Sequence, residues 1–131
     1  LNEKNPGSRY RTVSEFANQT EDKNSIVDPK VKSALITTLE LDDNPGVRKR
    51  ALTALLNLPY DQQLKDALLY TLVKDSNSGI RIAAINGLTS AKMEGNKFDE
   101  ETLKILKQKS KNDDNEYVRI RAASLVKEAQ L

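Results

Sequence analysis

The side chains of this chain that could carry chemistry are carboxylates, lysines, arginines and tyrosines, because it contains no Cys, His or Trp. A thiolate or imidazole metal site, a disulfide framework and a Ser/His/Asp or Cys/His catalytic set are therefore excluded. Among the adjacent acidic residues, Glu100-Glu101 and Asp113-Asp114 are considered as candidate acids and bases. One pair opens an expected helix and the other precedes a helix cap, where the helix dipole favours a carboxylate without any catalytic role. We therefore expect no enzymatic activity, no metal and no cofactor.

Charge and hydropathy further narrow the classes of protein to which this chain could belong. The formal net charge is +2, and the 31% of residues that are charged mix both signs along the chain. Such a balance argues against a nucleic-acid binder driven by electrostatics, which normally concentrates Lys and Arg on one face. No apolar run approaches the ~20 residues that a transmembrane helix needs, and no signal peptide is visible.

One sequence pattern recurs four times, beginning at Asn5, Asn44, Asn77 and Asn115, at intervals of 39, 33 and 38 residues. Each copy has an arginine four positions after the asparagine, and three of the four have an alanine seven positions after it. Self-similarity at this period is the signature of a stacked repeat array. We predict an all-α fold, a right-handed α-solenoid of stacked antiparallel helix pairs with about seven helices.

The caps and the apolar spacing place these helices. Asn or Asp followed by Pro marks a helix start at residues 5, 28 and 44, and Asp61 and Asp99 are further caps. The expected helices are about 6–18, 29–41, 45–58, 62–74, 78–91, 100–111 and 116–129. The polar segments 19–27 and 92–97 are expected to be loops. We predict a single repeat domain over 1–131, with a truncated first repeat at 1–18 and further repeats at 28–58, 61–91 and 99–131. Because the chain begins inside a repeat, we expect a fragment of a longer protein.

The pattern Asp-x-Asn-x-x-[Val/Ile]-Arg-x-x-Ala resembles HEAT repeats of the short, bilin-lyase-like bacterial kind. In that family an acidic residue in the turn and an arginine six positions later form a ladder along the stack. The positions that keep this spacing are Asp42 and Arg48, Asp75 and Arg81, and Asp113 and Arg119, with Glu3 and Arg9 as a first rung. A planar guanidinium can bridge such a carboxylate to the next repeat, so we interpret these residues as scaffold.

The resemblance also implies a binding face, because second helices line the concave side of HEAT arrays. The positions opposite the expected core positions Val47, Ala51, Ala54, Leu55 and Leu58 define this second-helix face. Its members are Tyr10, Arg11, Lys49, Arg50, Thr53, Ile82, Asn86, Ile120, Arg121 and Ser124. Tyr10, Ile82 and Ile120 would be apolar anchors within a basic rim, a composition that suits a polypeptide partner. The same residues could instead be isolated solvent-facing side chains, which are normal on any surface.

Two other functions stay open. Some HEAT-like proteins, including a family of alkylpurine DNA glycosylases, grip a duplex with the concave face, although four basic residues fall short of the ~6–10 phosphate contacts of a tight site. The chain could also be a structural spacer within a larger membrane-anchored regulator, located in the cytoplasm or the periplasm. We expect a monomer that makes no membrane contact of its own and binds a protein whose identity the sequence does not reveal.

Overall fold

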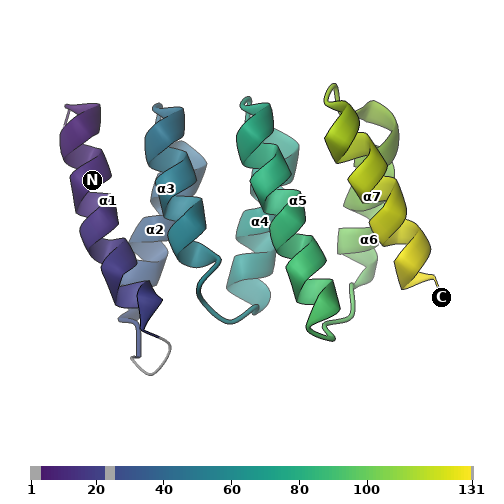
Figure 1. Ribbon diagram of the computed structural model, residues 1–131, viewed down its shortest axis with the longest axis horizontal. Coiled ribbons are helices and arrows are strands. Elements are labelled where there is room, and N and C mark those ends of the chain that lie inside the picture. Colours follow the sequence, from purple (N-terminus) through teal and green to yellow (C-terminus); the bar gives the residue numbers. More distant parts are fainter. Residues whose placement is uncertain (1–3, 23–25, 131) are drawn as a thin grey trace. The chain divides into compact units, whose positions relative to one another are not determined.

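The computed structural model describes residues 4–22 and 26–130. Within these ranges it contains seven helices and no strand, so the predicted all-α fold is confirmed (Figure 1). The helices are α1 (Pro6–Glu21), α2 (Pro29–Leu41), α3 (Pro45–Leu55), α4 (Gln62–Lys74), α5 (Ser78–Met93), α6 (Glu100–Asn112) and α7 (Glu116–Ala129).

The helix starts agree with the predicted ones, because each is set by a local cap. The side chains of Asn5, Asp28, Asn44, Asp61, Asn77, Asp99 and Asn115 each accept a hydrogen bond from a main-chain N–H in the first turn of the helix that follows. These bonds satisfy donors that have no partner within the helix. The starts of all seven helices could therefore be read from the sequence.

Three helix ends differ from the prediction by two or more residues. Helix α1 continues to Glu21, where Thr20 is buried and its hydroxyl donates to the carbonyl of Ala17 at 2.7 Å. Helix α3 ends at Leu55, and Leu58 donates from its main-chain N–H to the carbonyl of Leu55 in a tighter turn. Leu58 is therefore only partly buried, and its assignment to the core face is wrong.

Helix α5 runs two residues beyond Ala91, to Met93, and ends at a glycine. Gly95 has φ 98° and is the one residue with positive φ in the described part of the chain. The N–H of Asn96 donates to the carbonyl of Ala91, and the N–H of Gly95 donates to the carbonyl of Lys92. These two bonds form a Schellman C-cap, so the expected loop begins after Met93 rather than at Lys92.

The chain divides into two compact units, Leu1–Ala67 and Leu68–Leu131. In the first unit, α3 packs against both α1 and α2, and Figure 1 shows α1 and α3 side by side. The fully buried side chains of this unit include Val13, Ala17, Leu35, Ala51 and Leu55. A single repeat domain over 1–131 stays a prediction.

In the second unit, α7 packs against both α6 and α5. Ala84, Leu88, Leu106, Ala122 and Leu125 are fully buried here. Ala84 and Ala122 occupy the same place in the repeat as Ala51 in the first unit, and all three are inaccessible to solvent. Because the interior is close-packed, a larger side chain would not fit at this place in the repeat.

Candidate functional site

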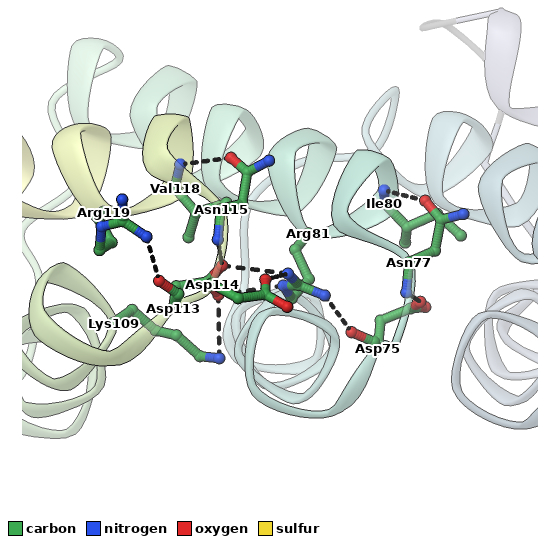
Figure 2. Close-up of polar contacts among 10 residues, drawn as sticks. All are labelled: Asp75, Asn77, Ile80, Arg81, Lys109, Asp113, Asp114, Asn115, Val118 and Arg119. Atoms are coloured by element: carbon green, nitrogen blue, oxygen red, sulfur yellow. Dashed lines mark hydrogen bonds and ion pairs between the residues drawn. The ribbon is translucent and has the colours of Figure 1, made fainter.

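The Asp-x-Asn turns are built by local hydrogen bonds. In the turn before α7, Asp113 Oδ1 accepts from the main-chain N–H of Asn115 at 2.9 Å, and Asn115 Oδ1 accepts from the N–H of Val118 at 3.1 Å (Figure 2). The turns before α3 and α5 repeat both bonds, with Asp42 and Asn44 in one and Asp75 and Asn77 in the other. The aspartate shapes the turn and the asparagine caps the helix.

A buried arginine joins two of these turns in the second unit. Arg81 donates from Nη1 to the main-chain carbonyl of Asp75 at 2.9 Å, and from Nε and Nη2 to the two carboxylate oxygens of Asp113, both at 3.1 Å. Nη2 also donates to Asp114 Oδ1 at 2.5 Å (Figure 2). The side chain of Asp113 is only 1% exposed. This is the bidentate pairing for which the planar guanidinium is suited.

The first unit has the same arrangement around Arg9. Its Nε donates to Asp42 Oδ2 at 2.8 Å, and its Nη2 donates to Asp42 Oδ1 at 3.1 Å and to Asp43 Oδ1 at 2.8 Å. Nη1 donates to the main-chain carbonyl of Lys4 at 2.8 Å. Glu3, the expected partner of Arg9, lies outside the described residues.

The predicted pairing of each arginine with the aspartate six positions earlier needs a correction. Arg48 and Arg119 donate from Nη1 to the main-chain carbonyls of Asp42 and Asp113, as Arg81 does to that of Asp75. The earlier aspartate thus offers its carbonyl to the arginine, while its Oδ1 accepts the N–H of the capping asparagine. In the pairs of Arg9 and Arg81, the carboxylate comes from the turn one repeat later.

The two inter-turn carboxylates are held ionised. Burial alone would raise the pKa of Asp113, but hydrogen bonds from Arg81, the main-chain N–H of Asn115 and Lys109 outweigh it, and the pKa lies below its usual value. Burial likewise would raise the pKa of Asp42, but hydrogen bonds from Arg9 and the main-chain N–H of Asn44 outweigh burial, and this pKa also lies below its usual value. A polar cavity of about 250 Å³ lies beside Arg81, Lys109 and Asp113. Its charged walls already pair with one another, which suits a structural role better than acid–base catalysis.

The other acidic pair, Glu100-Glu101, lies exposed in the first turn of α6, the position that the helix dipole favours. Within residues 4–22 and 26–130, no group of three or more acidic side chains is arranged to hold a metal ion. None of the helices in that part of the chain combines the length and apolarity needed to cross a bilayer.

The part of the second-helix face in the first unit is open to solvent. Tyr10 is 45% exposed, and Arg11, Lys49 and Thr53 are exposed as well. Arg50 is partly buried because it lies across the neighbouring helix, where its Nε donates to Ser14 Oγ at 3.1 Å. Arg50 therefore contributes to α1–α3 packing in addition to the surface charge.

The part of the second-helix face that lies in the second unit is more apolar. Ile120 is 61% exposed, whereas Ile82 is half-buried. Arg121 donates from Nε to Thr89 Oγ1 at 3.2 Å, and Ser124 Oγ donates to Glu128 Oε1 at 3.3 Å. Arg121 therefore also links neighbouring second helices, α7 to α5.

Tyr117 belongs to this surface and was missed. It is 46% exposed, and its hydroxyl donates to Asn86 Oδ1 on α5 at 2.9 Å. It stands where the other copies have Gly7, Gly46 and Gly79. A Cβ at those glycines would lie 3.1–3.2 Å from Oδ1 of the capping asparagine, a tight contact that glycine avoids. The replacement of the repeat's glycine by tyrosine at position 117 was the feature of the sequence that could have indicated this surface residue.

Antiparallel helix pairs whose capped turns are tied by buried Asp–Arg pairs define a helical repeat protein. The family model for HEAT repeats matches residues 31–127, and the chain belongs to this family. HEAT repeats are commonly scaffolds for protein interactions and are generally non-catalytic. A search of characterised proteins finds no significant match, and neither does a search of solved structures.

Proposed function

We propose that this chain is a non-catalytic interaction module that binds a polypeptide segment through the second-helix face, to which we add Tyr117. The observation that carries the proposal is the cluster of Tyr117, Ile120, Asn86 and Arg121 in the second unit. It combines two exposed apolar or aromatic side chains with an amide and a guanidinium. Buried aromatic and aliphatic anchors with nearby arginine are typical of protein-binding hot spots.

The cluster spans two helices that are already fixed to one another. The Tyr117 hydroxyl on α7 reaches Asn86 on α5, and Arg121 on α7 reaches Thr89 on α5. A surface whose side chains are held before binding loses less conformational entropy when a partner docks. Ile120 and the ring of Tyr117 would cover apolar side chains of the partner, while the remaining donors of Asn86 and Arg121 would bind its carbonyl oxygens.

The first unit presents a related but more basic surface. Tyr10 is its aromatic residue, and Arg11 and Lys49 are exposed beside it on the second-helix face. We propose that this part contributes orientation through charge, because exposed charges change association rates more than they change affinity.

The test compares two substitutions of the same kind. Ile120→Asp places a charge in the proposed anchor, and Met93→Asp places one at an apolar residue that is 82% exposed at the end of α5 and outside the face. Wild type and both variants, each carrying a photo-crosslinker at Ala123, which is exposed on α7, are used to capture partners from a lysate of the source organism at ~0.15 and ~0.5 M salt. The charge is placed at Ile120 and not at Ile82, because Ile82 is half-buried and its replacement would perturb folding.

A protein that is crosslinked by wild type and Met93→Asp at both salt concentrations, and lost with Ile120→Asp, would support the proposal. Nucleic acid that is recovered at ~0.15 M and lost at ~0.5 M salt would favour the nucleic-acid function instead. Equal capture by all three proteins would rule out this face, and an absence of any partner would favour the spacer function.

A further inference from the structure

Arg50 reaches from α3 across to the neighbouring α1, where one nitrogen of its guanidinium is held (Figure 1). Its Nε donates to Ser14 Oγ at 3.1 Å, and among the residues that the structure describes its Nη1 and Nη2 have no hydrogen-bond or ion-pair partner. In the second unit, Arg121 is held in the same way by the hydroxyl of Thr89 at 3.2 Å. The bond to Ser14 orients the guanidinium of Arg50 and leaves four N–H donors on its terminal nitrogens.

Arg50 is separate from the arginines that join the turns. Arg9 and Arg81 are buried, and they bind carboxylates of the next turn with Nε and Nη2 and a main-chain carbonyl with Nη1. In α3 the position of these arginines is occupied by Arg48, two residues before Arg50. Arg50 is only half-buried, and its helix is flanked in the sequence by the second helices α1 and α5. Its terminal nitrogens therefore have no role in joining the turns.

Two further cations surround Arg50 on the second-helix face. Ser14, to which Arg50 is bonded, stands three positions after Arg11 on α1, and side chains at this spacing are neighbours on a helix surface. Lys49 directly precedes Arg50 on α3, and both Arg11 and Lys49 are exposed. Within the described part of the chain, no ion pair joins these three cations to Glu15 on α1 or to any other carboxylate. Cations gathered without a counter-ion attract an anionic partner.

We propose that the second-helix face of the first unit recognises an acidic linear segment of the partner, in which an Asp or Glu carboxylate binds Nη1 and Nη2 of Arg50 in bidentate fashion. Arg11 and Lys49 attract further carboxylates of the same segment. This recognition rests on the function proposed above, because the segment is the polypeptide that the second-helix face binds. A planar guanidinium edge matches two carboxylate oxygens, whereas three cations fall short of the ~6–10 phosphate contacts of a tight nucleic-acid site.

The test selects ligands for the whole chain from a random library of dodecapeptides displayed on phage. We expect the selected peptides to be enriched in Asp and Glu relative to the unselected library. Synthetic copies of the most enriched acidic peptides are then compared by fluorescence anisotropy with copies that have Asn and Gln in place of Asp and Glu. The neutral copies should bind roughly tenfold more weakly or worse, since they lose charge-assisted hydrogen bonds.

Variants of the chain show where the acidic peptides bind. Arg50→Gln retains an N–H donor for Ser14 but has neither the charge nor the planar fork, and it should weaken binding roughly tenfold. Arg11→Gln changes an exposed side chain and should weaken binding roughly threefold without affecting packing. Lys30→Gln removes the same charge from an exposed position on the first helix α2 and should bind as wild type does. Thermal unfolding of each variant checks that it remains folded.

Several results would overturn the proposal, and they differ in what they say of the function proposed above. Selected peptides that are not acidic, or that bind Arg50→Gln and Arg11→Gln as tightly as wild type, would overturn the acidic recognition alone if Ile120→Asp abolishes their binding. Equal weakening by Lys30→Gln would show attraction to the charge of the whole chain instead of to this site. Selection of no peptide would contradict both proposals, and tighter binding of a single-stranded DNA oligonucleotide would favour the nucleic-acid function.

Discussion

The guanidinium of Arg81 and the carboxylate of Asp113, 32 residues apart in the sequence, share two parallel hydrogen bonds of 3.1 Å each. The carboxylate is almost fully buried and receives further bonds from Lys109 and the main-chain N–H of Asn115. The pair therefore ties the turn after α4 to the turn after α6. A buried charge pair of this kind costs most when one partner is removed, because the other charge is left without compensation.

Arg81→Ala should lower the free energy of unfolding by about 2–4 kcal/mol, because within the described residues it leaves Lys109 as the one cation paired with the buried carboxylate of Asp113. Urea unfolding followed by circular dichroism measures the change. Arg119→Ala is the matched control, since Arg119 makes the same carbonyl bond and has no ion pair with any residue that the structure describes, and it should cost only about 0.5–1.5 kcal/mol. Equal losses in the two variants would show that the inter-turn pair adds nothing to stability.

Ala84→Leu should destabilise the protein by about 1–3 kcal/mol, because the larger side chain has to enter a fully buried position. Ala123 is the control, since it lies exposed on α7. Ala123→Leu should change stability by less than ~0.5 kcal/mol, as surface substitutions usually do. A neutral or stabilising Ala84→Leu would contradict the assignment of this position to the helix contact.

Acid should weaken the fold through Asp42, Asp61 and Asp113, whose pKa values all lie below the usual 3.8. Because the folded pKa values are the lower ones, the unfolded chain binds more protons, and stability falls as the pH drops below about 4. Asp113→Asn should be less stable than wild type near pH 7, and this difference should shrink near pH 3. Urea midpoints at both pH values test this, and a difference that stays constant with pH would argue against a linked Asp113.

Glu40 should change the stability with pH in the direction opposite to that of the three aspartates. Its pKa lies above the usual 4.5, first because of burial and then because of the nearby charge of Asp66. The folded chain therefore holds the proton more tightly, and stability attributable to Glu40 falls as the pH rises through and beyond 4.5. Glu40→Gln should stabilise the protein near pH 7 by about 0.2–1 kcal/mol, the range of partly exposed charge interactions.

The control for Glu40 is Glu15→Gln, which removes the same charge from an exposed position on α1. It should have a smaller effect at neutral pH, and the gain of Glu40→Gln should vanish near pH 3, where the wild-type carboxyl is protonated as well. A loss of stability in Glu40→Gln at neutral pH would show that the carboxylate has a favourable partner.

The sequence by itself determined the features that depend on neighbours within a few residues. The repeat interval predicted the stacked helix pairs, and the caps Asn5, Asp28, Asn77 and Asp99 predicted where helices begin. These could be read because each hydrogen bond of a cap joins residues only two or three positions apart. The match to HEAT repeats followed from the same local pattern.

Only the tertiary structure decided which carboxylate each arginine binds. The spacing of six pointed to Asp75 for Arg81, whereas packing of α5 and α6 against α7 brings the turn with Asp113 to its side chain. The contact between Tyr117 and Asn86 is likewise set by how helices pack. Contacts between residues more than 30 positions apart depend on the whole array of buried side chains, and a local pattern does not encode that array.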